Sequence, residues 1–134
     1  MLNCRDAIAS KNISVFMVTG GAGASSVSVE LLSSNGTRLC SLPNLIGQRY
    51  HHSQTGLLSC GGGTGGDKET TCETFVDGRW KKSHTLGQSR YAHTAWASPQ
   101  GVLLMGGHYS RTTTELLMDN GHTTPSFPLQ NSKS

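Results

Sequence analysis

The fold of this protein is decided by three short apolar segments that each end in a double glycine. They are Val15-Phe16-Met17-Val18-Thr19-Gly20-Gly21, Leu57-Leu58-Ser59-Cys60-Gly61-Gly62 and Val102-Leu103-Leu104-Met105-Gly106-Gly107. The first glycines of successive pairs lie 41 and 45 residues apart in the 134-residue chain. Self-similarity with a period of this length is typical of repeat architectures. The sequence therefore predicts an array of three units.

A second short segment follows each double glycine and carries a glutamate. These glutamates are Glu30, Glu73 and Glu115, and each segment runs into a turn dipeptide. The dipeptides are Asn35-Gly36, Asp77-Gly78 and Asn120-Gly121. Asn-Gly and Asp-Gly supply the positive φ angles of tight hairpin turns, so a further strand follows each turn. Every apolar segment is short and rich in β-forming residues, so we expect an all-β chain with four antiparallel strands in each unit.

Each unit begins at an arginine. Arg5, Arg49 and Arg90 are 44 and 41 residues apart, and the last two open the segments Arg49-Tyr50-His51-His52 and Arg90-Tyr91-Ala92-His93. These two segments share the pattern Arg-Tyr-x-His. The register divides the chain into units at residues 5–48, 49–89 and 90–130.

The strand before each double glycine is apolar on both faces, which indicates that a neighbour covers each face. Four-stranded sheets stacked face to face around an axis meet this demand and form a β-propeller. The glycines permit positive φ and allow a neighbouring backbone or a bulky ring to approach closely. We therefore assign a structural role to Gly20, Gly21, Gly61, Gly62, Gly106 and Gly107.

These features resemble kelch repeats, in which Arg-Tyr-x-His, a double glycine, a glutamate-bearing strand and a Trp before a Leu follow one another. The resemblance covers essentially the whole chain and is best in the second unit, which matches at Arg49, His52, Gly61, Gly62, Glu73, Trp80 and Leu86. Elsewhere Leu39 and Thr124 fall near the Trp position. The resemblance implies a partial kelch-type β-propeller of three four-stranded antiparallel blades, with Trp80 as a structural repeat residue.

The resemblance also implies a protein-interaction module without enzymatic activity or cofactor, whose protein or peptide partner lies across the mouth of the propeller. Arg, Tyr and His can anchor an acidic or amide-rich peptide through charge-assisted bonds and ring contacts. The candidate contact residues are Arg49, Tyr50, Lys68, Arg90, Tyr91, Tyr109 and Arg111. For Arg49 and Arg90 the alternative is that they are solvated or satisfy carbonyl groups at the edge of a sheet.

Two other functions stay open at this point. In the first, the chain is a structural scaffold without a dedicated ligand. In the second, it belongs to a galactose-oxidase-like enzyme, since such enzymes contain kelch-type blades and hold copper by Tyr and His. Nothing marks a unique constellation among Tyr50, Tyr91 and Tyr109. His52 and His93 occupy equivalent repeat positions, which favours a repeated structural hydrogen bond over a shared metal.

The charge balance points away from nucleic acid as a partner. The 11 Lys and Arg and the 8 Asp and Glu give a net charge of +3, which is weak and scattered. Apolar runs are too short for a membrane span, and residues 1–10 lack the apolar core of a signal peptide. The compartment is left undecided between extracellular and cytoplasmic.

Cys60 and Cys72 are predicted to be cross-strand neighbours. If the double-glycine strand and the glutamate strand form a hairpin around residues 63–70, facing residues have numbers that sum to about 132, as 60 and 72 do. In an oxidising compartment they would form a disulfide, and otherwise they are two buried thiols.

Three blades do not close a propeller, which typically has about 4 to 8. We expect the outer faces of the first and third sheets to be uncovered, and the missing blades to come from a longer chain or from a second copy.

Overall fold

The computed structural model describes residues 4, 8, 14–21, 23, 26–63, 70–108, 111–121 and 123–125, and these residues form three antiparallel sheets. Sheet 1 consists of β1 (Val15–Thr19), β2 (Val29–Ser33) and β3 (Arg38–Ser41). Sheet 2 consists of β4 (Ser53–Thr55), β5 (Leu58–Cys60), β6 (Thr71–Val76) and β7 (Arg79–Thr85). Sheet 3 consists of β8 (Thr94–Ser98), β9 (Gly101–Met105), β10 (Thr114–Leu117) and β11 (Thr123–Pro125).

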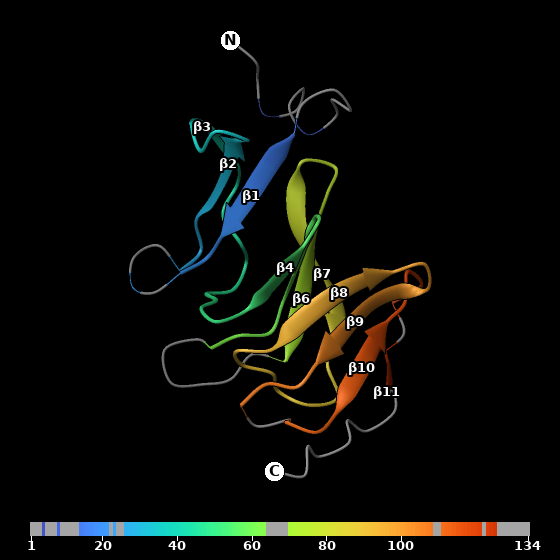
Figure 1. Cartoon of the computed structure of the whole chain (residues 1–134). Coiled ribbons are helices and arrows are strands. Elements are labelled where there is room, and N and C mark those ends of the chain that lie inside the picture. Colours follow the sequence, from blue (N-terminus) through green and yellow to red (C-terminus); the bar gives the residue numbers. More distant parts are fainter. Residues whose placement is uncertain are drawn as a thin grey trace.

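Within each sheet the strands pair in the order in which they occur in the chain, and the three sheets follow one another in chain order from the top to the bottom of Figure 1. The predicted all-β class is confirmed, and the second and third units have the predicted four strands. Sheet 1 has three strands among the described residues. The predicted start of this unit at Arg5 and the end of the third unit near residue 130 lie outside the described residues.

The turn dipeptides lie between the strands as predicted, but only Asp77-Gly78 has positive φ at both residues, and Asn35 and Asn120 do not have positive φ. Gly36 lies between β2 and β3 with φ of 85°, and Gly121 lies between β10 and β11 with φ of 87°. Between β6 and β7, Asp77 and Gly78 have φ of 53° and 80°. Positive φ at both central residues is the geometry of a tight hairpin turn whose twist matches that of the strands.

Two hydrophobic clusters lie between successive sheets. The first is formed by Val29, Leu31, Leu42, Leu45 and Trp80, and the second by Cys60, Cys72, Leu86, Leu104 and Leu117. The indole of Trp80 is buried, packs 5.4 Å from the ring of Phe75 and donates a hydrogen bond from Nε1 to the Pro43 carbonyl at 3.0 Å. Sheet 2 is therefore covered on both faces.

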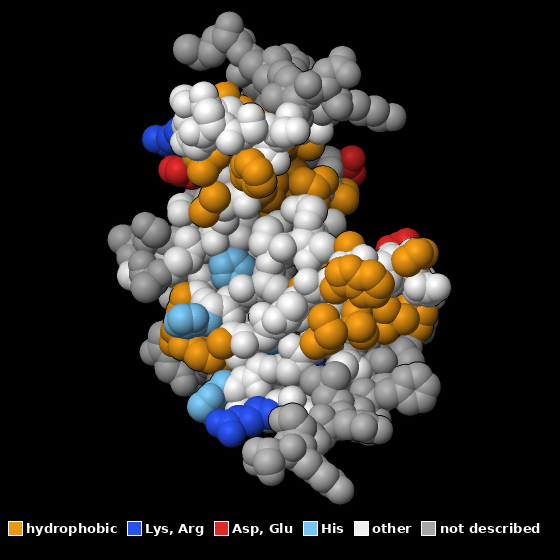
Figure 2. Space-filling view, viewed as in Figure 1, with side chains coloured by type: hydrophobic (Ala, Val, Ile, Leu, Met, Phe, Trp, Pro, Cys, Tyr) orange, Lys and Arg blue, Asp and Glu red, His pale blue; other side chains and the backbone are white. Residues whose placement is uncertain are grey.

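The outer faces of the stack are open, as predicted. The side chains of Phe16 and Val18 on β1 are 59% and 50% exposed, and that of Trp96 on β8 is 58% exposed. Figure 2 shows hydrophobic side chains gathered over sheet 1 and over sheet 3. In the described part of the chain, no helix is long and apolar enough to cross a membrane.

The first two double glycines are the contact points for the unit that follows each of them, and all six glycines of the three pairs have positive φ. A methyl group at Gly61 would lie 2.6 Å from the carbonyl oxygen of Arg90 and 2.8 Å from Cε1 of His93. The next amide, Gly62, donates a hydrogen bond to the same carbonyl at 2.7 Å. This confirms the close approach of backbone and ring that was predicted at these glycines.

The same contact recurs one unit earlier. At Gly20 a methyl group would meet the Arg49 carbonyl and would lie 2.6 Å from Cε1 of His52. The Gly21 amide donates to the Arg49 carbonyl at 2.9 Å. Both boundaries between units therefore use the same contact.

Cys60 and Cys72 are directly paired in the β5–β6 register, with their Cα atoms 4.1 Å apart, and form a disulfide. The predicted pairing is thus confirmed in its oxidised form. Cys4 and Cys40 form a second disulfide, with Cα atoms 5.9 Å apart. The sequence did not predict this bond, because Cys4 lies in no recognisable strand and its distance to Cys40 depends on the tertiary fold.

We expect Cys60→Ala combined with Cys72→Ala to lower the free energy of unfolding of the oxidised protein by about 3 kcal/mol, because the bond closes a short loop in the unfolded chain. Urea unfolding with and without reductant measures this. The difference between the variant and the parent should vanish once Cys4–Cys40 and Cys60–Cys72 are both reduced. Equal stability of the two oxidised proteins would contradict the expectation.

Candidate functional site

Arg49 is the most deeply buried charged side chain among the described residues of the second unit, at 1% exposure. Its Nε donates to Oε2 of Glu73 at 2.9 Å. Its Nη1 donates to the carbonyls of Gly61 and Thr71 at 3.0 and 2.7 Å, and its Nη2 donates to Oγ1 of Thr71 at 2.9 Å. The Glu73 carboxylate also accepts the amides of Ile46 and Gly47. The guanidinium therefore joins the ends of β5 and β6 to the connection that precedes β4.

Arg90 repeats this arrangement in the third unit, at 0% exposure. Nε donates to Oε1 of Glu115 at 3.0 Å, and Nη1 donates to the carbonyls of Gly106 and Thr113 at 2.7 and 3.0 Å. Nη2 donates to Oγ1 of Thr113 at 3.0 Å, and the Glu115 carboxylate accepts the Gly87 amide at 2.9 Å. The planar guanidinium group holds its N–H donors in a fixed arrangement, which suits arginine to a buried site with several acceptors.

These contacts correct the expectation that Arg49 and Arg90 anchor a partner. Both guanidinium groups are enclosed, and their donors are used by carboxylates, carbonyls and hydroxyls of the same unit. A buried charge needs such partners, since an uncompensated one is very costly. The alternative that the arginines satisfy carbonyl groups at the sheet edge holds instead.

Glu30 occupies the equivalent place in sheet 1 but has a different partner. The amides of Gly20, Gly61 and Gly106 bond the carbonyls of Ser28, Thr71 and Thr113, and the glutamate stands two residues later in each case. Glu30 pairs with Arg38 at the surface, where Nε and Oε1 are 3.4 Å apart and the side chains are 41% and 61% exposed. The arginine that the repeat expects here, Arg5, lies outside the described residues.

His52 and His93 link successive units. His52 Nε2 lies 2.7 Å from Oγ1 of Thr19, and His93 Nε2 lies 2.8 Å from Oγ of Ser53. Because Thr19 donates its proton to Oε1 of Gln54, it accepts from His52, which places the imidazole proton on Nε2. The Nδ1 atoms of both histidines are buried without a partner among the described residues. The predicted repeated structural hydrogen bond is therefore present.

Burial keeps both histidines neutral. Desolvation, reinforced by the charge of Arg49 and opposed by that of Glu73, lowers the pKa of His52 from 6.5 to about 4. Desolvation also lowers the pKa of His93 to about 4, with further contributions from the charges of Arg90 and His52. A neutral ring is the form that fits against the double glycine of the preceding unit.

Four rings gather on one rim of sheets 2 and 3, and we call them the ring cluster. The ring centroids of Tyr50 and Tyr91 are 5.7 Å apart, those of His51 and Tyr91 are 4.8 Å apart, and those of Tyr91 and His108 are 6.5 Å apart. The tyrosines are half-buried and the histidines are exposed. Two of the predicted contact residues, Tyr50 and Tyr91, are therefore brought together, and two exposed imidazoles extend the surface.

The backbone of the cluster follows from the repeat. His51 and Ala92, the variable residues of Arg-Tyr-x-His, have φ of 53° and 55°, and the Ala92 amide donates to the His51 carbonyl at 2.8 Å. Positive φ at a non-glycine residue is strained and often marks function. The second and third units both have this positive φ, so the strain is a property of the repeat. Only the side chain of His51 is specific to the ring cluster.

The remaining predicted contact residues are divided. Arg111 is exposed and its Nε donates to the His108 carbonyl at 3.3 Å, so it borders the cluster. Lys68 and Tyr109 lie outside the described residues. His51 and His108 were not predicted as contact residues, although His51 directly follows the predicted Tyr50 and His108 directly precedes the predicted Tyr109.

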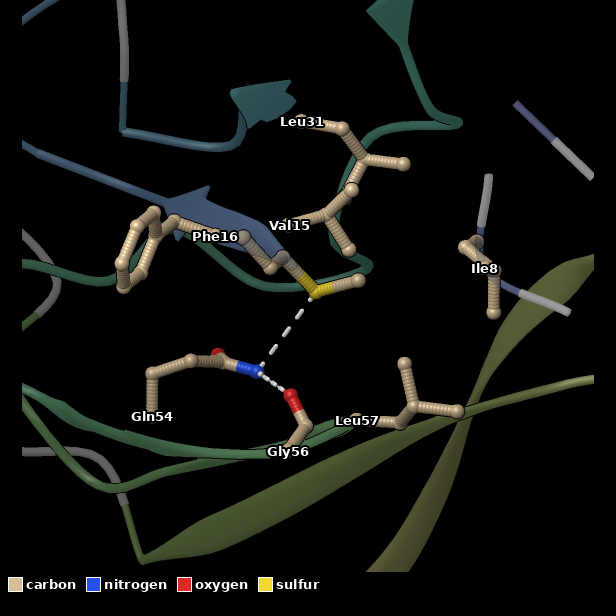
Figure 3. A pocket seen from close by; sticks show the side chains of 8 residues that line it. Ile8, Val15, Phe16, Leu31, Gln54, Gly56 and Leu57 are labelled. Carbon is tan, nitrogen blue, oxygen red and sulfur yellow. Dashed lines mark hydrogen bonds between the residues drawn. The ribbon is translucent and has the colours of Figure 1, made fainter. Parts of the chain in front are cut away.

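A separate apolar cavity of about 390 Å³ lies between sheet 1 and the β4–β5 turn (Figure 3). Gln54 reaches across it and donates from Nε2 to the Gly56 carbonyl at 2.8 Å, with Sδ of Met17 at 3.6 Å. Residues from both faces of β1 line it, so it follows the edge of β1 that does not pair with β2. In sheets 2 and 3 that edge is occupied by β4 and β8. The cavity thus lies at the edge of sheet 1 where, among the described residues, sheets 2 and 3 have one more strand.

No protein-family model matches the chain, and no curated protein matches it either. Among the described residues, no three His, Cys, Asp or Glu side chains are grouped as ligands of a metal ion would be.

Glu73→Ala and Glu115→Ala are each expected to lower the free energy of unfolding by about 3–5 kcal/mol, because each leaves a buried guanidinium unpaired. Glu30→Ala is the matched control, since its exposed ion pair contributes at most about 1 kcal/mol. Urea unfolding of the three variants measures the difference. Similar losses in all three would show that the buried pairs are not specially stabilising.

The two buried histidines should make stability depend on pH. Their pKa is about 4 in the folded protein and 6.5 in the unfolded chain, so the unfolded chain binds more protons between these values. The free energy of unfolding should therefore fall as the pH drops from 6.5 to 4. His52→Gln combined with His93→Gln keeps a donor and removes the titration, so its profile should be flatter. If the free energy of unfolding depends on pH in the same way in the variant and the parent, the two histidines are not the cause of the pH dependence.

Proposed function

We propose that the chain is a protein-interaction module, built from three kelch-type blades of an incomplete β-propeller, and that the ring cluster contacts the partner. Three antiparallel sheets in chain order, the repeated Arg-Glu pairs and the repeated docking on double glycines support the propeller arrangement. The gathering of Tyr50, His51, Tyr91 and His108 from three separate connections is the observation that carries the binding role.

The chemistry of the ring cluster suits a peptide or a protein loop. Half-buried tyrosines offer a rigid apolar surface with a polar tip, and such residues dominate binding energy in protein interfaces. The exposed His51, His108 and Arg111 side chains add hydrogen-bond donors around the tyrosines. An amide-rich or acidic segment offers acceptors whose chemistry suits these side chains. Two disulfides further favour an oxidising compartment for this module.

A peptide selection tests the proposal. A displayed random peptide library is panned against the full chain, and the enriched peptides are measured against His51→Asn combined with His108→Ala. Asn tolerates the positive φ at position 51, so this variant removes two exposed rings without adding strain. Val76→Ser, an exposed change at the far end of β6, is the matched control.

We expect the double variant to weaken binding at least about 10-fold, equivalent to about 1.4 kcal/mol, and the control to leave it unchanged. Peptides that bind the double variant as tightly as the parent would place the contact elsewhere. A selection that enriches no peptide would favour the scaffold without a dedicated ligand.

A further inference from the structure

The turn between β2 and β3 carries the triplet Asn35-Gly36-Thr37, which has the form Asn-x-Thr with a residue other than proline in the middle. This is the acceptor motif for N-linked glycosylation, which modifies surface loops of secreted proteins. A chain rich in Ser and Thr contains such triplets by chance, so the motif alone assigns nothing. The exposure of the triplet, its hydrogen bonds and the pairing of the cysteines distinguish it.

All three residues of the triplet are exposed at the end of the hairpin. The turn is closed by its backbone, since the Ser33 amide donates to the Thr37 carbonyl at 2.8 Å and the Gly36 amide donates to the Ser33 carbonyl at 2.9 Å. A methyl group at Gly36 would meet nothing within 4 Å. A bulky group attached to Asn35 therefore has open space beside the turn and does not disturb its backbone hydrogen bonds.

The hydrogen bonds of the Asn35 side chain leave its nitrogen available. Oδ1 accepts the backbone N–H of Thr37 at 3.0 Å and the hydroxyl proton of Ser33. Both bonds use the carboxamide oxygen, and Nδ2 has no hydrogen-bond partner among the described residues. Nδ2 is the atom to which an N-linked sugar is attached, so it is free at the surface in the orientation that the oxygen fixes.

The cysteines place the chain where such sugars are attached. Cys40, in the strand that follows the triplet, forms a disulfide with Cys4, and Cys60 forms one with Cys72. No cysteine is left free. Disulfides form in the secretory pathway and are rare in the cytosol, and the same pathway carries out N-linked glycosylation.

We infer that Asn35 is the attachment site of an N-linked glycan. The donor is an oligosaccharide joined through its anomeric carbon to a polyprenyl diphosphate, and a transferase of the secretory pathway supplies the catalytic groups. Nδ2 forms a bond to the anomeric carbon and gives up one proton to a base of the transferase. The bond from that carbon to the diphosphate oxygen breaks, and the diphosphate leaves with the bonding electrons. No group is oxidised or reduced.

The glycan and the ring cluster lie at opposite ends of sheet 1. Thr19 pairs with Val29 at the start of β2, whereas Asn35 follows the end of β2. The Gly21 amide, next after this first end, bonds the Arg49 carbonyl beside Tyr50. The glycan therefore leaves the ring cluster accessible. It stands instead at the start of β3, the edge strand of sheet 1, where a hydrophilic sugar hinders pairing with another chain.

The test expresses the full 134-residue chain behind a cleavable secretory leader in a eukaryotic host. An endoglycosidase trims each glycan to one sugar residue, and peptide mapping by mass spectrometry locates it. The retained sugar distinguishes glycosylation from deamidation, which Asn-Gly also undergoes. We expect the sugar at Asn35. Asn120 is the control within the same chain, because it is exposed in the equivalent Asn-Gly turn but has His122, without a hydroxyl, two residues later. It should stay unmodified.

Thr37→Val should abolish the glycan, because it removes the hydroxyl of the motif and keeps a β-branched side chain. Thr37→Ser is the matched control and should keep the glycan. An unmodified Asn35 in the secreted, disulfide-bonded parent chain would overturn the proposal, as would a glycan that survives Thr37→Val. A glycan found only at Asn12, in the triplet Asn12-Ile13-Ser14, would also overturn it. The readout involves no binding partner, so failure of the proposed binding role leaves it unchanged.

Discussion

The buried pair of arginine and glutamate is the interaction on which the rest of the structure depends. In each of the second and third units the guanidinium lies between the ends of two strands and the connection that enters the sheet, and the carboxylate accepts backbone amides of that connection. The pair therefore sets where the entering chain runs. Because both charges are removed from water, neither can leave without a large cost, and the arrangement is held in one geometry.

The contact between units follows from the same pair. The carbonyl of each anchored arginine is the acceptor for the double glycine of the preceding unit, and the histidine three residues later packs on the first glycine. Each arginine thus contacts its own sheet through its side chain and the preceding sheet through its backbone carbonyl. Only glycine fits at the contact positions of the preceding unit, since a Cβ there would meet backbone and ring atoms and the φ angles are positive.

The ring cluster is a consequence of this anchoring. Tyr50 and Tyr91 directly follow the two arginines, so the repeat places their rings 5.7 Å apart on one rim. His51 takes the strained position that the repeat imposes, and its ring lies on Tyr91. The arginines that hold the rim are therefore buried and structural, while Tyr50, His51 and Tyr91 of the proposed contact surface follow them directly in the chain.

The sequence by itself determined the features that depend on neighbouring residues. The alternation of apolar runs and turn dipeptides predicted the strands, the double glycines predicted the positive φ angles, and the short β5–β6 hairpin placed Cys60 opposite Cys72. Only the tertiary structure decided the environment of Arg49 and Arg90, because a charged side chain reads as exposed until its carboxylate, 24 or 25 residues away, is shown to meet it. The same holds for Cys4 with Cys40 and for His51 and His108 beside Tyr91, because the members of each pair are far apart in the sequence and only the folded chain brings them together.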